Sequence, residues 1–233
     1  MEFQITKRGR ALRPAASLSQ TRKNGLVEYQ TIAAPAVAEL EISRSRFLTR
    51  IERVETEAEA RAVIADAREQ HPRARHHCSA FVLGAGQRTQ RSNDDGEPSG
   101  TAGAPMLDAL TSAGLSDVVA VVTRYFGGVL LGAGGLTRAY RAAVAEAVLG
   151  AERVTRAPRQ RVAILAPYDV AAQLEAEARR RGWGIGEARY GEAVERDFAV
   201  AEREVEALKA VAAELSAGAA RVTLGEARYV DLA

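Results

Sequence analysis

A group of glycines beside an arginine is the first part of this sequence that could do chemistry. Gly132, Gly134 and Gly135 come directly before a helix expected over residues 136–149, and Arg138 falls in its first turn. Glycines before a helix leave backbone N–H groups free to hold an anion, and the guanidinium adds a full positive charge. The spacing matches neither a Walker loop nor G-x-G-x-x-G. The alternative is that these glycines serve tight turns and close helix packing.

Three carboxylates lie within four residues on an earlier loop, at Asp94, Asp95 and Glu97. The loop itself holds no lysine or arginine to neutralise them. Such a cluster can coordinate a hard cation, accept protons or pair with arginines from elsewhere in the chain. Pairing with Arg124 and Arg138 is the simplest interpretation, because it requires no metal.

The same two segments contain the other candidate ligand-binding residues. Ser99 and Thr101 could bind a ligand, or they could cap a helix expected over residues 104–113. The remaining candidates of this group are Gly127, Gly128 and Tyr140.

A strand expected over residues 76–83 begins with His76, His77 and Cys78. Because alternate residues face opposite sides of a strand, His76 and Cys78 share one face and His77 lies on the other. This spacing allows two metal ligands or a Cys-His nucleophile pair. No further cysteine or histidine stands at zinc-ligand spacing, so a core or surface role is the simpler interpretation and we expect no metal.

The elements that must position these residues alternate between strands and helices. Thr56 and Glu59 form the sequence pattern of a capping box, and the amphipathic helix that follows ends at His71-Pro72. Before residue 150, further strands are expected over residues 28–32, 39–42, 46–54, 87–92 and 118–122. From residue 161 the order is strand, helix, strand, strand, helix, strand, which is the ferredoxin-like βαββαβ plan with one sheet face left open.

We therefore expect an α+β protein with four segments. They are a basic, disordered extension over residues 1–26, an N-terminal domain over residues 27–150, an arginine-rich linker over residues 151–160, and a ferredoxin-like domain over residues 161–233. The net positive charge comes from the extension, since residues 1–25 sum to +5 while the whole chain is +2, which leaves 2 − 5 = −3 elsewhere. A start codon assigned too early would also explain the extension.

The composition is that of an ordinary globular protein, with 47% hydrophobic and 27% charged residues. The single cysteine excludes an internal disulfide and suits a reducing cytoplasm. The longest uncharged stretch in the most apolar segment, residues 125–137, is too short and too rich in glycine to span a bilayer. No signal-peptide pattern is present, so we expect a cytoplasmic protein without a membrane partner.

The chain resembles the YigZ/IMPACT family over about residues 28–233. The resemblance rests on A-R-H-H-C-S-A at residues 74–80, D-D-G-E-P-S-G-T-A-G at residues 94–103, T-R-Y-F-G-G-V-L-L-G-A-G-G-L-T-R-A-Y at residues 123–140 and, more weakly, S-R-F-L at residues 45–48. It implies a first domain with the ribosomal-protein-like α/β fold of elongation factor G domain IV. The second domain would be ferredoxin-like, similar to domain V of that factor.

The resemblance implies a function in the regulation of translation. We expect a non-enzymatic protein that binds RNA, the ribosome or a translation factor. The alternative is an enzyme or binding protein for a phosphorylated small molecule, held by the glycine-rich loops. No catalytic constellation can be assembled from the sequence, no cofactor is expected, and the oligomeric state stays open.

Overall fold

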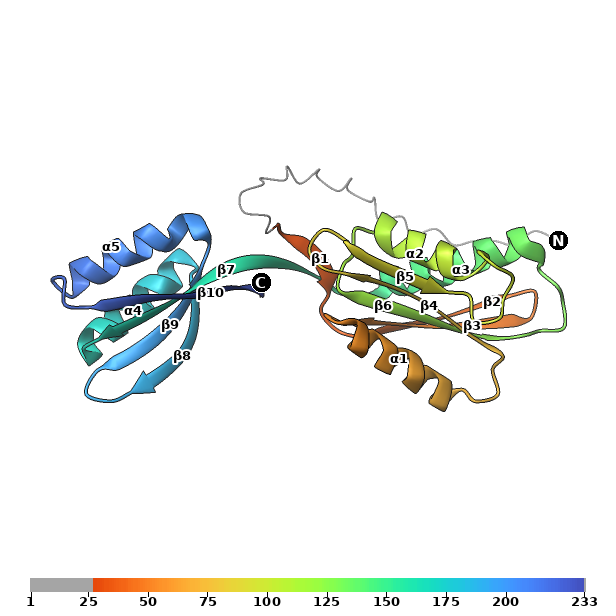
Figure 1. The fold of residues 1–233 in the computed structure, drawn as a ribbon, viewed down its shortest axis with the longest axis horizontal. Helices are drawn as coiled ribbons and strands as arrows, with labels where there is room; N and C mark the ends of the chain where they lie inside the picture. Colours follow the sequence, from red (N-terminus) through yellow and green to blue (C-terminus); the bar gives the residue numbers. More distant parts are fainter. Residues whose placement is uncertain (1–26, 233) are drawn as a thin grey trace, which may run out of the picture.

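The computed structural model describes residues 27–232, which form two antiparallel sheets and five α-helices (Figure 1). The expected α+β class is therefore confirmed. The N-terminal sheet has the strand order β2-β3-β6-β4-β5. Its strands are β2 (Ala36–Ile42), β3 (Ser45–Arg53), β4 (His76–Leu83), β5 (Thr89–Asn93) and β6 (Val118–Tyr125).

Helices cover both faces of the N-terminal sheet. They are α1 (Glu57–Gln70) on one face and α2 (Gly103–Ser112) and α3 (Gly132–Gly150) on the other. The predicted capping box of α1 is confirmed, because the Thr56 hydroxyl accepts the Glu59 N–H at 3.2 Å and the Glu59 carboxylate accepts the Thr56 N–H at 3.1 Å. This cap fixes where the chain leaves β3 and enters α1.

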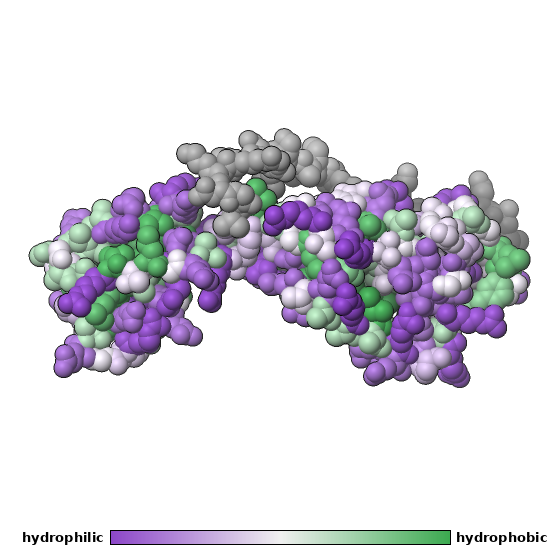
Figure 2. Space-filling view, viewed as in Figure 1, coloured by the Kyte–Doolittle hydropathy of each residue, from purple (hydrophilic) through white to green (hydrophobic). Residues whose placement is uncertain are grey.

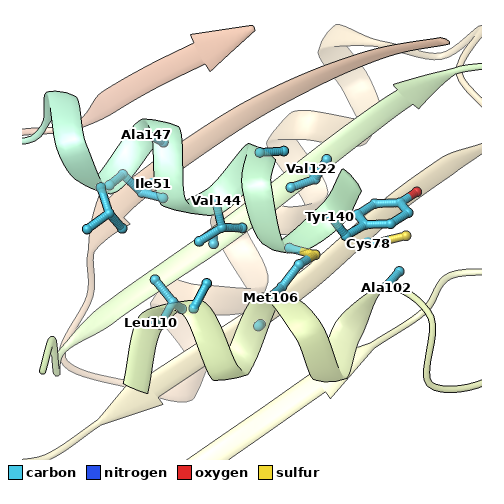
Figure 3. Close-up of a cluster of buried hydrophobic side chains, with 14 of the residues drawn as sticks. Ile51, Cys78, Ala102, Met106, Leu110, Val122, Tyr140, Val144 and Ala147 are labelled. Atoms are coloured by element: carbon cyan, nitrogen blue, oxygen red, sulfur yellow. The ribbon is translucent and has the colours of Figure 1, made fainter. Parts of the chain in front are cut away.

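The main core lies between the sheet and the α2–α3 layer. Figure 3 shows side chains from all three elements in contact there, including Met106, Val122 and Val144. Tyr140 is fully buried and meets the Phe47 ring edge-on, with ring centroids 5.2 Å apart. A smaller apolar cluster lies under α1. Two-sided burial explains why β6 is an almost unbroken apolar run rather than an alternating one.

The C-terminal sheet has the order β10-β7-β9-β8, and β1 also pairs with β7. Its strands are β1 (Tyr29–Ile32), β7 (Arg153–Ala166), β8 (Gly184–Tyr190), β9 (Val194–Val200) and β10 (Arg221–Leu232). Helices α4 (Tyr168–Arg181) and α5 (Val205–Leu215), the latter after a 3-10 turn (Glu202–Glu204), bury one face against Val162, Ile164 and Phe198. The order of elements expected after residue 161 is the order observed.

Two expectations about the middle of the chain are wrong. Most of the expected linker over residues 151–160 belongs to β7, because β10 pairs with β7 from Thr155 to Leu165. Pro158 fits this strand because β1 pairs only with residues 153–156 and β9 only with residues 160–166, so one side of the strand at Pro158 needs no N–H donor. In addition, β1 joins the C-terminal sheet, although its residues precede the N-terminal one.

Arg156 of β7 lies at the junction between the two sheets. Its Nη1 donates to the Glu55 carboxylate at 2.8 Å and to the Tyr29 hydroxyl at 3.0 Å. Its Nη2 donates to the Tyr229 carbonyl at 3.2 Å. Buried Asp117 accepts hydrogen bonds from the Tyr29 hydroxyl and from a backbone N–H of the β4–β5 turn. Groups from both sheets therefore converge on one guanidinium.

The molecule is elongated, and its space-filling surface is hollowed beneath the junction (Figure 2). Within residues 27–232 there is no helix of sufficient length and apolar character to cross a membrane. The expected extension over residues 1–26 lies outside the described residues.

Candidate functional site

The two longest sequence motifs meet at one end of the N-terminal sheet, which we call the motif end. β3 and β4 begin there and β6 ends there, since Arg46 pairs with Tyr125 and His76 pairs with Arg124. The β5–α2 loop carries the acidic motif and the β6–α3 loop carries the glycine motif. Residues far apart in the sequence are thereby brought into one cluster.

Glu97 and Arg124 form a buried ion pair at the motif end. Arg124 Nη1 donates to Glu97 Oε1 at 2.7 Å, and their side chains are only 7% and 4% exposed. The Tyr140 hydroxyl donates to the same carboxylate oxygen at 2.8 Å. Burial raises the pKa of Tyr140, so its hydroxyl stays protonated and remains a donor. This arrangement links the acidic loop to both β6 and α3.

The Arg124 guanidinium is enclosed by further groups. Its Nη2 lies 3.3 Å from Ser45 Oγ, and its central carbon lies 5.4 Å from the Phe47 ring centroid and 5.7 Å from that of Phe126. Its Nε is buried without a hydrogen-bond partner among residues 27–232. Gly127 donates its N–H to Ser45 Oγ at 3.2 Å, and a side chain at Gly127 would overlap the backbone before Ser45. This position therefore requires glycine because of a close backbone approach.

Asp94 holds the start of α2. Its Oδ1 accepts the N–H groups of Ala102 and Gly103 at 3.0 and 2.8 Å, and its Oδ2 accepts the Gly100 N–H at 2.8 Å. Burial alone would raise the pKa of Asp94, but the three backbone donors outweigh it, so the net shift is downward. The Asp94 carboxylate therefore caps the N-terminus of α2.

Neither Ser99 nor Thr101 caps α2, contrary to one of the two roles that we considered for them. Ala102 is the N-cap residue and makes no side-chain cap. The Thr101 hydroxyl donates to the Pro98 carbonyl at 2.6 Å, and Ser99 is exposed. The cap comes instead from Asp94, which lies eight residues before Ala102.

Asp95 connects the acidic loop to β4 and α1. Its carboxylate accepts from Arg68 Nη2 at 2.5 Å and from the His77 N–H at 2.6 Å. Its carbonyl accepts from His76 Nδ1 at 2.8 Å. Desolvation lowers the pKa of His77 and favours its neutral form. All three carboxylates of the motif therefore have internal partners, but the expected pairing with Arg124 or Arg138 is found only for Glu97 with Arg124, because Asp95 pairs with Arg68 and Asp94 accepts backbone N–H groups.

Cys78 is fully buried beside this cluster, on the same sheet face as His76. Its thiol donates to the Asp94 carbonyl at 3.0 Å, and burial raises its pKa to about 12 (Figure 3). A thiol in this state is a poor nucleophile. No group of three or more acidic, histidine or cysteine side chains suited to a metal ion occurs in the described part of the chain.

The glycine segment differs from its expected form. α3 begins at Gly132, so Gly132, Gly134 and Gly135 form the first turn of the helix rather than a loop before it. The positive φ values of Gly128 and Gly132 explain why glycine is needed where the chain turns into α3. Arg138 is exposed and has no carboxylate partner among residues 27–232, so the expected pairing of Arg138 with the acidic loop is wrong.

An exposed group around the buried cluster was not predicted from the sequence. We call it the basic surface, and it consists of Arg138, which was a candidate, together with Arg44, Arg73, Arg75, Phe126 and Leu130. Phe126 is 50% exposed and Leu130 is 87% exposed. A weak signal was present, because Arg44 and Arg75 directly precede two strands that begin with motif residues. Their exposure depends on the fold.

Comparison with known proteins agrees with this architecture of two α+β units. The Impact N-terminal domain model matches residues 43–148, and the model of a domain of unknown function, DUF1949, matches residues 164–219. The first match contains the motif end and all of the basic surface. The second contains β8, β9, the last residues of β7 and both helices of the C-terminal unit.

Full-length relatives extend these matches. IMPACT family member YvyE of Bacillus subtilis is 41% identical over 89% of this chain and 96% of its own length. IMPACT family member YigZ of Escherichia coli is 47% identical over 50% of this chain and 58% of its own length. A crystal structure described only as that of a hypothetical protein shares 34% identity, covers 85% of this chain and 98% of its own, and has a TM-score of 0.61. The chain belongs to the IMPACT family.

Proposed function

We propose that this protein is a non-enzymatic, cytoplasmic regulator of translation that binds single-stranded RNA through the basic surface. The carrying observation is a set of exposed arginines without carboxylate partners in the described chain, next to an exposed aromatic ring. Unpaired arginines bind phosphates, and aromatic rings stack on unpaired bases. The two kinds of side chain together match a single strand of RNA better than they match a protein interface.

The basic surface is assembled from three connections of the N-terminal sheet. Arg44 lies in the β2–β3 turn, against which Gly127 packs. Arg73 and Arg75 lie between α1 and β4, and His76, which follows them, pairs with Arg124 in β6. Phe126 contacts the Arg124 guanidinium, so the buried ion pair supports the exposed ring from below. We therefore interpret the buried cluster around Glu97 and Arg124 as the scaffold, and the basic surface around it as the region that contacts RNA.

The fold is consistent with this proposal. We infer that the C-terminal unit is ferredoxin-like, because its βαββαβ elements adopt the order β10-β7-β9-β8 with both helices on one face. We also infer that the N-terminal unit is related to elongation factor G domain IV, as the family resemblance implies. Support from fold alone is analogy, so the basic surface carries the functional argument.

Binding of a fluorescent 20-nucleotide oligo(U) at several salt concentrations tests the proposal. With four arginines contacting phosphates, the slope of log K against log salt is expected near −2.8, or about a 50-fold loss of affinity from 50 to 200 mM. Phe126→Ala is expected to weaken binding by about fivefold or more through lost stacking. Affinity that is absent or insensitive to salt would contradict the proposal.

A matched pair of triple variants separates local from general charge effects. Arg73→Ala, Arg75→Ala and Arg138→Ala together should reduce the salt slope to about −0.7. The control replaces three exposed arginines that are ion-paired within their own helices, Arg61, Arg179 and Arg180. Both variants remove three positive charges, so equal losses of affinity would show that the basic surface has no special role.

The alternative of an enzyme for a phosphorylated small molecule has less support. Asp94, Asp95 and Glu97 already hold internal donors, and the Cys78 thiol is buried and protonated. Within the glycine-rich segment, Arg138 and the first turn of α3 form the exposed anion-binding feature. A thermal-shift screen with nucleotides and sugar phosphates at millimolar concentration tests this alternative, and stabilisation that Arg138→Ala abolishes would favour it.

A further inference from the structure

Two arginines lie directly opposite each other near the junction, and the proposed function does not use them. Strands β7 and β10 run side by side through this part of the molecule (Figure 1), and Arg159 of β7 pairs in register with Arg228 of β10. Side chains that are directly opposite in an antiparallel pair share one face, with Cβ atoms about 5 Å apart. Two positive charges are therefore held close together.

Neither of these arginines is neutralised within the described chain. Arg228 is exposed and has no hydrogen-bond or ion-pair partner among residues 27–232, and Arg159 donates only to the Pro158 carbonyl, at 3.1 Å. Like charges directly opposite each other destabilise a sheet, and an anion placed between them removes the repulsion. The pair is therefore a position where a negative group from outside the chain would be stabilised.

The opposite edge of the same sheet shows the usual arrangement. Arg189 of β8 and Glu195 of β9 are directly opposite each other and form an ion pair at 3.0 Å. Opposite charges in this position stabilise a strand pair. The pair of Arg159 and Arg228 departs from this arrangement, so its charges are available to a partner.

Arg153 extends the positive charge along β7. It lies six residues before Arg159, so alternation gives both side chains the same face, about 20 Å apart. Arg153 is exposed, and its Nη1 donates to the Ala113 carbonyl at 3.1 Å and to the Gln30 side chain at 3.4 Å. Both acceptors are neutral, so the charge of Arg153 is not compensated.

Arg88 adds a fourth positive charge from the N-terminal sheet. Gln87, which precedes it, donates to the Leu115 carbonyl at 2.9 Å, two residues from the carbonyl that Arg153 binds. Burial raises the pKa of Tyr229, and the charge of Arg88 is near enough to act against this rise. Arg88 is exposed and therefore lies close to both β7 and β10 at the surface.

We call Arg88, Arg153, Arg159 and Arg228 the second basic surface. None of them forms an ion pair with the part of the chain that the structure describes. Residues 26–233 sum to −3, so this concentration of unpaired arginines is local and not a property of the whole chain. The second basic surface and the motif end lie at opposite ends of the N-terminal sheet, because β4 ends and β6 begins at the junction.

Two features of the second basic surface indicate a double-helical partner. Its length of about 20 Å exceeds what one phosphate group can contact, so a polyanion fits it better than a small anion. No aromatic ring flanks the arginine pair on its face of the two strands, since Ala157 and Val230 occupy the neighbouring positions. The Tyr229 ring lies on the other face, against Arg156. Unpaired bases stack on aromatic side chains, whereas a double helix presents its phosphates and keeps its bases inside.

From these observations we propose that the second basic surface binds the phosphate backbone of double-stranded RNA. The inference rests on the proposed function, because it names a further part of the RNA partner, but it involves none of the residues of the basic surface. The two surfaces divide the contacts, with unpaired nucleotides at the motif end and a duplex at the junction. Phosphate contacts position a duplex without reading its bases, so binding is expected to be independent of sequence.

Binding of a fluorescent, blunt-ended 20-base-pair RNA duplex at several salt concentrations tests the second basic surface. With four phosphate contacts, the slope of log K against log salt is expected near −3.6, or about a 150-fold loss of affinity from 50 to 200 mM. Arg159→Ala and Arg228→Ala together should reduce the slope to about −1.8. The matched control, Arg179→Ala with Arg180→Ala, removes two exposed arginines that are ion-paired within α4 and should leave the slope unchanged. Absence of duplex binding, or equal effects of the two double variants, would overturn the proposal.

Crossed measurements separate this proposal from the proposed function. The double variant of the second basic surface should bind oligo(U) as the wild type does, and the triple variant of the basic surface should bind the duplex as the wild type does. Duplex binding that only the triple variant loses would overturn the inference and leave the proposed function in place. Duplex binding by a protein that does not bind oligo(U) would support the inference and contradict the binding of single-stranded RNA.

Two further measurements complete the test. Displacement of the duplex by poly(glutamate) at equal charge concentration would overturn the proposal in favour of an acidic protein segment. Because Arg159 and Arg228 repel each other, their joint removal should leave the thermal midpoint unchanged or raise it. Loss of duplex binding at an unchanged midpoint therefore supports a direct contact, and a lowered midpoint would contradict the repulsion on which the proposal rests.

Discussion

Two buried arginines, Arg124 at the motif end and Arg156 at the junction, are surrounded by similar groups. They are 6% and 8% exposed, and each has a buried Nε without a hydrogen bond to the described part of the chain. Each guanidinium also lies within 6.0 Å of two aromatic ring centroids. The rings are Phe47 and Phe126 for Arg124, and Tyr29 and Tyr229 for Arg156.

The carboxylates distinguish the two sites. Glu97, the partner of Arg124, has a side chain only 4% exposed, whereas two of the three carboxylates beside Arg156, Glu55 and Asp231, are 53% and 45% exposed. The third, Asp117, is 7% exposed and lies 3.6 Å from Arg156 Nη1. A buried pair depends on both partners, because removal of one leaves an unpaired charge without water. Exposed carboxylates are solvated when their partner is lost. Arg124 therefore belongs to a buried core at the motif end. Arg156 belongs to a partly solvated contact between the two sheets, which we call the joint.

Glu97→Ala should have the largest effect on stability. It leaves the Arg124 guanidinium and the Tyr140 hydroxyl buried without their shared acceptor, and the expected loss is about 3–5 kcal/mol in the free energy of unfolding. Urea unfolding monitored by circular dichroism measures it. Glu41→Ala, an exposed glutamate of β2, should change stability by less than about 0.5 kcal/mol. A loss of about 1 kcal/mol or less for Glu97→Ala would remove the contrast between core and joint.

Arg156→Ala should be less destabilising, by about 2 kcal/mol, because two of its carboxylate neighbours can turn to water. Its distinctive consequence should be cooperativity, since Arg156 connects groups from both sheets. Calorimetry is expected to show two separated unfolding transitions in the variant. Arg159→Ala is the control, because Arg159 lies on the same strand and hydrogen-bonds only the neighbouring carbonyl. A single transition in the Arg156 variant would show that the joint does not couple the sheets.

The sequence predicted local features well because each depends on neighbouring residues. The capping box depends only on Thr56 and Glu59 standing three positions apart. The placement of His76 and Cys78 on one face depends only on this segment being a strand. The order of elements after residue 161 follows from hydrophobic periodicity in the same way. These signals are physical properties of short segments and remain valid in the fold.

Long-range pairing explains what the sequence could not predict. Pro158 and its arginine neighbours have the composition of a loop, and they become a strand only because β10 pairs beside them. Asp94 caps α2 from nine residues before its first residue, and α3 begins four residues earlier than expected. The close approach of Gly127 to the β2–β3 turn likewise joins segments about 80 residues apart.

Deleting one hydroxyl at each site sharpens the comparison without changing charge. Tyr140→Phe removes a fully buried donor to Glu97 and should cost about 2 kcal/mol. Tyr229→Phe removes a partly buried hydroxyl that donates to the Val27 carbonyl at 3.2 Å, and it should cost about 0.5 kcal/mol. Both variants keep their rings, so cavity effects are small. Equal losses in denaturant unfolding would argue that the two arginine sites are equally buried in practice.

Acid should weaken the junction through Asp231. The hydrogen bond from Arg53 at 2.8 Å is the main cause of the lowered pKa of Asp231, and the charge of Arg156 adds to it. A lowered pKa means that the stabilisation is present above the unfolded value near 4 and is lost as pH falls through the folded value. Because Asp231 is 45% exposed, we expect only about 0.5 kcal/mol at neutral pH.

Comparing the wild type with Asp231→Asn from pH 7 to pH 3 measures this contribution. The difference in unfolding free energy should shrink toward zero below about pH 4, and 1 M salt at pH 7 should reduce it as well. The cost of Glu97→Ala should change little with salt, because water and ions do not reach the buried pair. A salt-sensitive Glu97 contribution together with a salt-insensitive Asp231 contribution would reverse the assignment of core and joint.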